Sequence, residues 1–352
     1  MMLLEKDNRF KHIIYIDMDS LLPGEFSRKE PMPEAVEAVK MLAAHRRYDL
    51  YFLSTAPWEN PSAWAEKLEW VKKHFDSDKP DGVFYKKLIL THHKDLCIQR
   101  RTWLIDDRKD HGSEHFGHHW IRIGSEEFPD WNSVANFFVG GAPDAAKRET
   151  RNQIWGTQFL SSLNENHEER DRRFRPILYF DMDNVLVDFR SGLDKVSPEI
   201  KAQYEDDGTG KPHYDDIPGL FSLMEPMPGA IEAIKALAAS SRYDLYILST
   251  APWGNPSAWS DKVEWVKKHL DSNRPDGVFY KRLILTHHKN LCIQPRAWLI
   301  DDRKAHGSEH FEHHWIPFGS DKFPDWDAVV YFFLNCDTGS VMRMTRKKGW
   351  SL

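Results

Sequence analysis

The sequence has few cysteines, no long apolar run and no surplus of basic residues. Three of its 352 residues are cysteines, Cys97, Cys292 and Cys336, which is too few for a disulfide framework. No stretch reaches the roughly 18 apolar residues that a membrane span needs, and residues 1–12 lack the apolar segment of a signal peptide. The net charge of −6 argues against a protein that coats nucleic acid. These absences predict a reduced, cytoplasmic protein without membrane or nucleic-acid partners.

The sequence does contain a repeat of nearly half its length. HIIYIDMDS at 12–20 returns as PILYFDMDN at 176–184, an offset of 164, and LYFLSTAPW at 50–58 returns as LYILSTAPW at 245–253, an offset of 195. Roughly three quarters of positions 32–138 match their partners, far more than two unrelated domains of one fold class would share. The length also suits two domains, at roughly 150 residues each. We interpret the chain as a tandem duplication, whose copies could contact one another.

The change of offset locates the one large difference between the copies. Copy 2 carries 31 more residues than copy 1 between its DMD motif and the following PMP sequence, which stands at 31–33 in copy 1 and at 226–228 in copy 2. A polar, charge-rich stretch separates the copies, and a short basic segment ends the chain. The predicted boundaries are 1–140 for the first domain, 141–173 for a linker, 174–337 for the second domain and 338–352 for a basic tail.

Strand-like and helix-like segments alternate within each copy. In copy 2, apolar runs at 177–180, 243–249, 282–286, 297–300 and 314–318 are typical of strands. Between them, 227–240 and 256–270 have helical periodicity, the second behind a proline suited to a first turn. Alternating strands and helices predict an α/β fold with a parallel, Rossmann-like sheet in each domain. Ligands of such sheets bind beyond the carboxyl ends of the strands.

Polar residues stand at those strand ends in copy 2. Asp181 and Asp183 leave an extended strand toward the same side, although a DxD pair alone is often a solvated strand end. Thr250 can donate to a phosphate oxygen, although a strand-end cap is the commoner role. Lys289 supplies a positive charge, whereas most loop lysines are solvated. The adjacent Asp301 and Asp302 need a compensating cation, and carboxylate oxygens suit Mg²⁺.

In the order DxD, Thr, Lys, DD, these elements resemble the four motifs of the haloacid dehalogenase superfamily over essentially all of 176–334. The resemblance implies that Asp181 is the nucleophile, Asp183 the general acid/base, Thr250 the phosphoryl-binding hydroxyl and Lys289 the orienting charge. It also implies that Asp181, the Asp183 carbonyl and one of Asp301 and Asp302 hold Mg²⁺. This is consistent with the chemistry, because a carboxylate attacks phosphorus readily only when a cation offsets the repulsion between two anions.

Within the superfamily, the phrases DMDNVLVDF, EPMPGA, LSTAPW and LIDDR resemble the 5′(3′)-deoxyribonucleotidase (cytosolic type C 5′-nucleotidase) family. That resemblance implies a small helical cap, here at about 189–225, and a substrate pocket with Phe189, Phe221 and Trp253. Core packing is the alternative role of these aromatic residues. The sequence departs from the family at His287–His288, where the family often has Arg-Asp, so the identity of the substrate stays open.

Copy 1 keeps the same residue types but lacks the cap-sized insertion. Its counterparts are Asp17, Asp19, Thr55, Lys94, Asp106 and Asp107. A degenerate packing partner and an active capless domain both remain open for this copy. The histidine-rich segments 111–120 and 306–315 could suggest zinc, but they lack cysteine or acidic partners at the usual spacing.

The sequence therefore predicts a Mg²⁺-dependent phosphomonoester hydrolase that works through an aspartyl-phosphate. Nucleoside monophosphates, deoxyribonucleotides first, are the leading substrates. The alternatives are a phosphatase for another small phosphate and a regulatory or scaffold protein in which neither site turns over.

Overall fold

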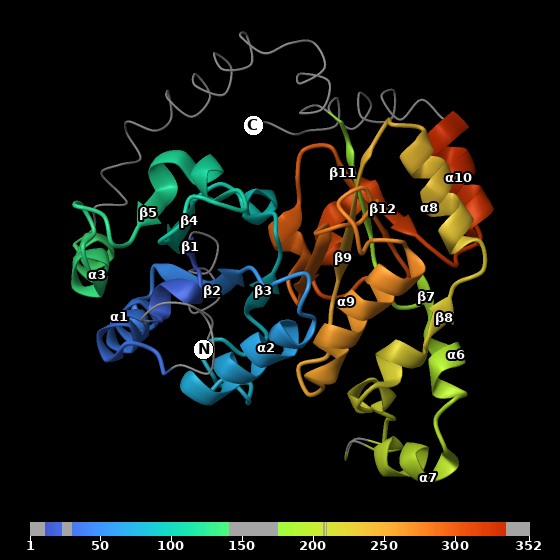
Figure 1. Cartoon of the computed structure of the whole chain (residues 1–352), viewed down its shortest axis with the longest axis horizontal. Coiled ribbons are helices and arrows are strands. Elements are labelled where there is room, and N and C mark those ends of the chain that lie inside the picture. The colour runs from blue at the N-terminus through green and yellow to red at the C-terminus, as the bar shows by residue number, and fades with distance from the viewer. Residues whose placement is uncertain (1–10, 23–29, 141–174, 207, 209, 336–352) are drawn as a thin grey trace, which may run out of the picture. The chain divides into compact units, whose positions relative to one another are not determined.

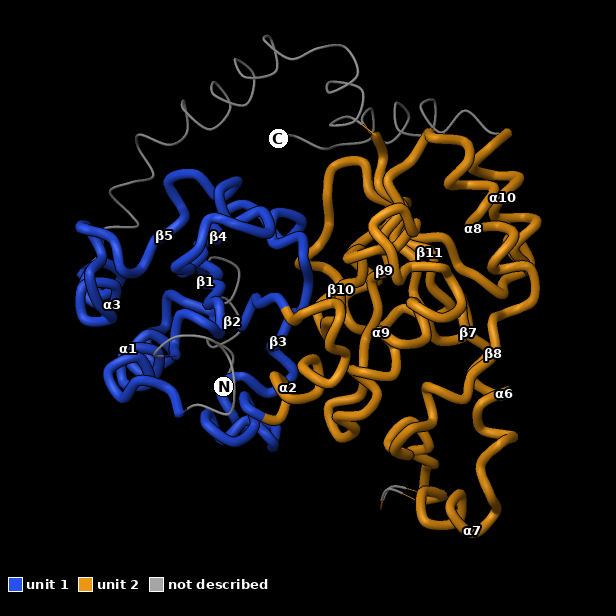
Figure 2. The backbone as a smooth tube through the Cα atoms, in the orientation of Figure 1, with its two compact units in different colours: residues 1–55, 70–174 blue, residues 56–69, 175–352 orange. Residues whose placement is uncertain are grey.

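The computed structural model describes residues 11–22, 30–140, 175–206, 208 and 210–335. The predicted linker and basic tail lie outside these residues, as does most of the interval in copy 1 that corresponds to the insertion of copy 2. The chain divides into two compact units, one of residues 1–55 and 70–174, the other of 56–69 and 175–352 (Figure 2). These limits differ from the repeat boundaries at 56–69, so the predicted domain limits stay a prediction.

Copy 1 forms five parallel strands in the order β3-β2-β1-β4-β5. The central strand β1 lies between β2 and β4, and its residues are almost all buried, as expected for a strand in a parallel sheet. The elements are β1 (His12–Ile16), α1 (Pro33–Ala44), β2 (Tyr48–Ser54), α2 (Ser62–His74), β3 (Leu88–Leu90), β4 (Thr102–Asp106), β5 (Trp120–Arg122) and α3 (Trp131–Val139), with short 3₁₀ helices η2 (Asp19–Leu21), η3 (Lys94–Cys97) and η4 (Ser113–His119).

Copy 2 repeats this arrangement, with strands in the order β10-β9-β6-β11-β12. The predicted strands and helices are confirmed to within a few residues, and the α/β class with parallel strands is confirmed in each copy. The elements are β6 (Ile177–Phe180), α8 (Ala230–Ala239), β9 (Asp244–Ser249), α9 (Ser257–His269), β10 (Leu283–Thr286), β11 (Ala297–Asp301), β12 (Trp315–Pro317) and α10 (Trp326–Asn335), with 3₁₀ helices η8 (Lys289–Cys292) and η9 (Ser308–His314).

The same tertiary contacts recur in both copies. Helices α8 and α10 pack side by side (Figure 1), as α1 and α3 do in copy 1. The Tyr243 hydroxyl donates to the Phe333 carbonyl at 2.8 Å, and its counterpart Tyr48 donates to Phe138 at 2.6 Å. A buried hydroxyl that reaches a helix end satisfies a carbonyl that the helix itself leaves free. The duplicated sequence thus specifies the same packing twice.

The insertion of copy 2, for which a cap at about 189–225 is predicted, folds into short helices, and we refer to this segment as the cap. It consists of α6 (Phe189–Leu193), α7 (Pro198–Lys201) and the 3₁₀ helices η5 (Ala202–Tyr204), η6 (Tyr214–Asp216) and η7 (Leu220–Leu223). Its two ends meet in the antiparallel pair β7 (Val187–Asp188) and β8 (Glu225–Pro226). The Asp188 carboxylate accepts the Arg190 and Ser191 N–H groups and so begins α6. The insertion leaves and rejoins the sheet at one place.

Candidate active site

Asp181 and Asp301 lie at the carboxyl ends of the adjacent strands β6 and β11. The Asp181 N–H donates to the Ile300 carbonyl at 2.9 Å, which places the two carboxylates side by side. Lys289 joins them, because its Nζ lies 3.1 Å from an Asp181 oxygen and 2.6 Å from an Asp301 oxygen. All three side chains are buried. The structure thus brings together three of the residues that the motifs predicted.

These carboxylates form one of two acidic groups able to hold a metal among the described residues. Asp181, Asp301 and Asp302 each offer an oxygen, and these oxygens lie within 4.8 Å of one another. Asp181 Oδ1 is buried and accepts no hydrogen bond from the described residues, although buried carboxylate oxygens are normally satisfied. Hard oxygen donors at this spacing fit Mg²⁺. Asp17, Asp106 and Asp107 form the equivalent group in copy 1.

The two carboxyls of the DxD pair differ in acidity. Burial alone would raise the pKa of Asp181, but the charges of Lys289 and Lys262 hold it below its ordinary value. Burial raises the pKa of Asp183, as does the charge of Asp181, against the opposing charge of Lys262. An ionised carboxylate beside one that keeps its proton more readily is the combination that a nucleophile and a general acid need.

Lys262 is a site residue that the sequence motifs did not identify. It lies on α9, is fully buried, and its Nζ is 2.8 Å from Asp183 Oδ1 and 3.1 Å from Ser249 Oγ. Buried lysines are rare unless paired. One sequence signal was available, because Lys262 follows Trp259 by three residues and therefore shares the inward face of the helix. Its counterpart in copy 1, Lys67, is equally buried.

The predicted threonines lie at the ends of equivalent strands. The Thr250 hydroxyl, just beyond β9, donates to the Thr286 carbonyl at 2.9 Å, and Thr55 makes the same bond to Thr91. Both threonines are half-buried. This bond fixes the side chain at the edge of the sheet beside the acidic group, while the phosphoryl-binding role stays a prediction.

The predicted aromatic residues lie in two different environments. The Phe189 and Phe221 rings, both from the cap, lie 6.1 Å apart, and Lys262 Nζ lies 4.8 Å from the centre of the Phe221 ring. Trp253 is instead buried, with its ring edge toward Trp259 and His287. The structure thus brings Phe221 close to the DxD pair through Lys262, and it packs Trp253 into the aromatic core.

The copy 1 site pairs its charges differently. Lys94 again joins the carboxylates, 3.1 Å from Asp17 and 2.5 Å from Asp106. Arg108, however, forms an ion pair with Asp19 and lies 3.8 Å from Asp17 Oδ2. In copy 2 the equivalent Arg303 lies 3.4 Å from Asp302 Oδ1.

The residue that follows each DxD pair also differs between the two copies. Asn184, with a positive φ of 57°, donates from Nδ2 to Asp302 at 3.2 Å. The shorter Ser20 donates to Asp107 at 3.1 Å and belongs to the 3₁₀ helix η2. The motif is therefore followed by a 3₁₀ helix in copy 1 and by a turn that leads into β7 in copy 2.

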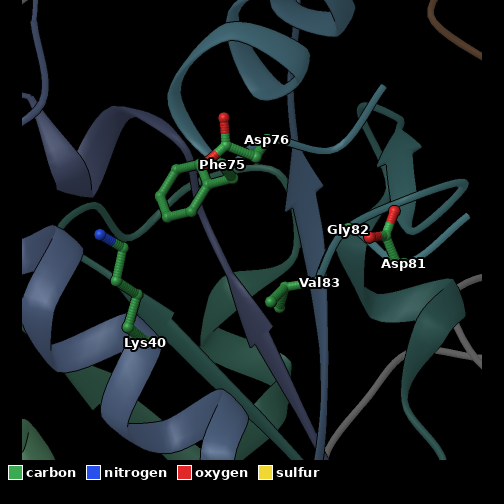
Figure 3. A pocket seen from close by; sticks show the side chains of 6 residues that line it. All are labelled: Lys40, Phe75, Asp76, Asp81, Gly82 and Val83. Atoms are coloured by element: carbon green, nitrogen blue, oxygen red, sulfur yellow. The ribbon is translucent and has the colours of Figure 1, made fainter. Parts of the chain in front are cut away.

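Two pockets, one in each copy, lie away from the acidic groups. A pocket of about 210 Å³ in copy 1 is lined by side chains at the end of α2 and in the loop that follows, together with Lys40 of α1 (Figure 3). A pocket of about 150 Å³ occupies the equivalent place in copy 2. Neither contains a residue of the acidic groups, so neither is the substrate site.

The histidine-rich segments contribute no ligand to either acidic group in the described structure. His287 is buried and lies edge-on to His306, at 5.7 Å between ring centres.

No helix in the described part of the chain combines the length and apolar character that crossing a membrane requires.

Comparison with known proteins links this geometry to one group of enzymes. The family model described as 5′ nucleotidase, deoxy (Pyrimidine), cytosolic type C protein matches residues 11–127 and 175–322, one segment in each copy. A candidate 5′(3′)-deoxyribonucleotidase of Vibrio phage KVP40 is 49% identical over 158 residues, which cover 45% of this chain and 84% of that protein.

Two mammalian proteins are more distant relatives. The human cytosolic-type 5′(3′)-deoxyribonucleotidase is 23% identical over 172 residues, 43% of this chain and 77% of that protein. The mouse mitochondrial 5′(3′)-deoxyribonucleotidase is 34% identical over 110 residues, 31% of this chain and 41% of that protein.

Proposed function

Because the chain belongs to the cytosolic type C 5′(3′)-deoxyribonucleotidase family of the haloacid dehalogenase superfamily, we propose that copy 2 dephosphorylates nucleoside monophosphates. The observation that supports this most directly is the buried Asp181–Lys289–Asp301 cluster at the carboxyl ends of β6 and β11. A buried carboxylate with a depressed pKa, at the end of a strand and beside a metal-binding group, is equipped to attack phosphorus. We propose deoxyribonucleotides as the preferred substrates, because the similar proteins are named 5′(3′)-deoxyribonucleotidases.

In the proposed reaction, an Asp181 oxygen bonds to phosphorus while the bond from phosphorus to the ester oxygen breaks. Asp183 gives its proton to the leaving ester oxygen, then takes a proton from the water that attacks the aspartyl-phosphate. Attack by water releases inorganic phosphate and restores the Asp181 carboxylate. The raised pKa of Asp183 suits a group that must carry a proton in the first step.

The remaining polar residues bind and neutralise charge. Lys289 stabilises the negative charge that accumulates between Asp181 and the phosphoryl group. Thr250 turns its hydroxyl hydrogen from the Thr286 carbonyl to a phosphoryl oxygen. Mg²⁺ held by Asp181, Asp302 and the Asp183 carbonyl, with Asp301 beside them, would supply the positive charge that lets two anions approach. Asp301 is also tied to Lys289 at 2.6 Å, so Asp302 is the freer oxygen donor.

The test begins with p-nitrophenyl phosphate, assayed with Mg²⁺ and after exhaustive chelation. Turnover should require the metal, and beryllium fluoride should inhibit by occupying the phosphoryl position on Asp181. A panel of nucleoside monophosphates and sugar phosphates then separates the nucleotidase from a phosphatase for another small metabolite. Absence of turnover on every substrate, with Mg²⁺ bound, would instead favour the regulatory or scaffold protein.

A further inference from the structure

Side chains just before and along one face of helix α9 bind backbone groups in the second half of the cap. Asn255, just before the helix, is 2% exposed, and its Nδ2 donates to the Asp215 carbonyl at 2.9 Å and to the Ile217 carbonyl at 3.0 Å. Ser257 Oγ accepts the Gly219 N–H at 2.9 Å. A side-chain amide that uses both of its hydrogens on backbone carbonyls fixes the turn as well as its distance from the helix.

The contacts continue along the same face of α9. Trp265 Nε1 donates to the Met224 carbonyl at 2.9 Å, and Asp261, one turn earlier, accepts from the Ser257 hydroxyl at 3.4 Å. Positions 257, 261 and 265 are one helical turn apart, so they form a single stripe. Side chains of α9 therefore bind cap backbone from 215 to 224, whatever side chains the cap carries there.

This stripe also connects the cap to the chemistry. Phe221 lies between the bound segments, with its ring 4.8 Å from Lys262 Nζ, which in turn lies 2.8 Å from Asp183. A shift of the cap turn would move Phe221, and with it a nucleoside bound against its ring, while Lys262 and Asp183 stay paired. Errors of about 1 Å in the position of a bound substrate can cost its reaction roughly a hundredfold.

Copy 1 provides an internal comparison. It keeps Asn60, Ser62 and Trp70 at the equivalent positions, with Glu66 in place of Asp261. Asn60 and Ser62 are exposed in copy 1, and Ser62 donates to Asn60 at 2.8 Å, as Ser257 does to Asn255. The Asn–Ser pair thus has the same structure in both copies, and among the described residues a cap segment is bound to it in copy 2 alone.

The glycine beside this pair differs between the copies. Gly254 has Glu59 as its counterpart. A Cβ at Gly254 would lie 2.7 Å from an oxygen of Asp216, a cap residue. A larger and acidic residue at this position would push against the cap carboxylate.

We propose that Asn255 and Ser257, with Gly254 leaving room, are positioning residues that hold the cap closed and give copy 2 its preference for nucleotides. The inference rests on the proposed function, because a preference for nucleotides requires nucleotide turnover. Small aryl phosphates reach Asp181 without the cap, whereas a nucleoside needs the ordered aromatic residues of the cap. We call the hydrogen bonds of Asn255 and Ser257 to the cap backbone the clamp. Loss of the clamp therefore changes substrate selectivity and leaves the hydrolysis of small aryl phosphates in place.

The kinetic test compares Asn255→Ala with its matched control, Asn60→Ala, in the full-length protein. Asn255→Ala should lower kcat/KM for the best nucleoside monophosphate by about tenfold, the usual size of one or two lost buried hydrogen bonds. Its kcat/KM for p-nitrophenyl phosphate should stay within about twofold, and Asn60→Ala should change neither. An equal fall on both substrates, or no fall on either, overturns the proposal. If Asn255→Ala does not fold, Ser257→Ala replaces it with the same expectations.

Hydrogen exchange of the amides at 214–223 tests the clamp without any turnover. Exchange there should quicken in Asn255→Ala and in Gly254→Glu, which copies the residue of copy 1, and should not change in Asn60→Ala. If exchange quickens but the wild-type protein hydrolyses no nucleotide, the clamp stands and the proposed function fails. If nucleotides are hydrolysed and neither exchange nor selectivity changes, the function stands and the clamp fails.

Discussion

The two copies carry the same catalytic residue types but pair them differently. In copy 2 the second DxD carboxylate, Asp183, is bound by the buried Lys262, and the exposed Arg303 lies against Asp302. In copy 1 the equivalent arginine, Arg108, pairs with Asp19 as well as lying 3.9 Å from Asp107, the counterpart of Asp302. Motif residues therefore do not define a site by themselves, because the same residue types form different ion pairs in the two copies.

The largest expected effect comes from the two nucleophile positions. Asp181→Asn should abolish hydrolysis of nucleoside monophosphates, since it removes the attacking oxygen with little change of volume. Asp17→Asn should leave nucleotide turnover nearly unchanged, because copy 1 has no cap-sized insertion to close over a small substrate. Steady-state assays of both folded variants on one nucleotide panel provide the measurement. The assignment is reversed if Asp17→Asn removes most of the activity, and the copies are coupled if both variants are inactive.

The next largest effect concerns the acid/base residue. Asp183→Asn should reduce kcat by roughly 10²–10⁴-fold, the usual contribution of a positioned proton donor. The matched variant Asp19→Asn should not affect nucleotide hydrolysis. The difference should shrink with p-nitrophenyl phosphate, whose leaving group needs little protonation. An undiminished difference on that substrate would argue that Asp183 acts in binding rather than in proton transfer.

Replacing the buried lysines tests stability as well as activity. Lys262→Met leaves Asp183 without its closest cation, so the free energy of unfolding should fall by about 3 kcal/mol, a usual cost of breaking a buried pair. Nucleotide turnover should fall too, since the pKa of Asp183 rises further when this charge is removed. Lys67→Met should also destabilise the protein but leave nucleotide turnover unchanged. Denaturant titration and steady-state kinetics measure the two effects separately, and equal losses of turnover would contradict the division of roles.

The smallest effect is a pH dependence of stability at the cap-binding face. Burial, assisted by the charge of Glu264, raises the pKa of Asp261 to about 6 from its ordinary 3.8. The protonated form is therefore favoured by the fold, and its stabilising contribution is lost as pH rises through about 6. Asp261→Asn should be more stable than the wild type above pH 6, by about 1 kcal/mol after allowance for solvent screening.

The stability difference should close as the pH falls toward 4, because both side chains are then neutral. Thermal unfolding across this pH range measures it. The exposed counterpart Glu66 provides the control, since Glu66→Gln should stay within about 0.5 kcal/mol of the wild type at every pH. If the stability difference between Asp261→Asn and the wild type is constant from pH 4 to 8, the pKa of Asp261 is not raised by folding.

The sequence predicted those parts of the molecule that depend on local pattern. Apolar strands such as β6 and β11 are almost entirely buried. The polar residues at their ends, Asp181 and Asp301, lie together because parallel neighbours end at one edge of the sheet. The insertion that predicted the cap was visible as a change of offset between the copies. The strands, their polar ends and the insertion follow from periodicity and spacing, whereas the interpretation of the insertion as a cap came from the family resemblance.

Other parts depend on tertiary contacts that no local pattern encodes. Lys262 lies on a helix whose apolar stripe dominated the sequence signal, and only the fold places its amine against Asp183. For Trp253 the sequence left both a pocket role and core packing open, and only the fold shows its ring against Trp259 and His287. The cap-binding role of Asn255 was equally invisible, because the identical Asn60 binds no such segment in the described structure.

The antiparallel pair β7–β8 also bears on how the two copies diverged. Because the cap departs and returns through neighbouring strands, the whole segment behaves as an exchangeable cassette, and its loss or gain need not disturb the order of the parallel strands. Joining two adjacent chain ends by a short connection costs little conformational entropy. Copy 1 still carries the Asn60, Ser62 and Trp70 side chains, so a cassette of residues 187–226 grafted there would meet a surface already suited to it.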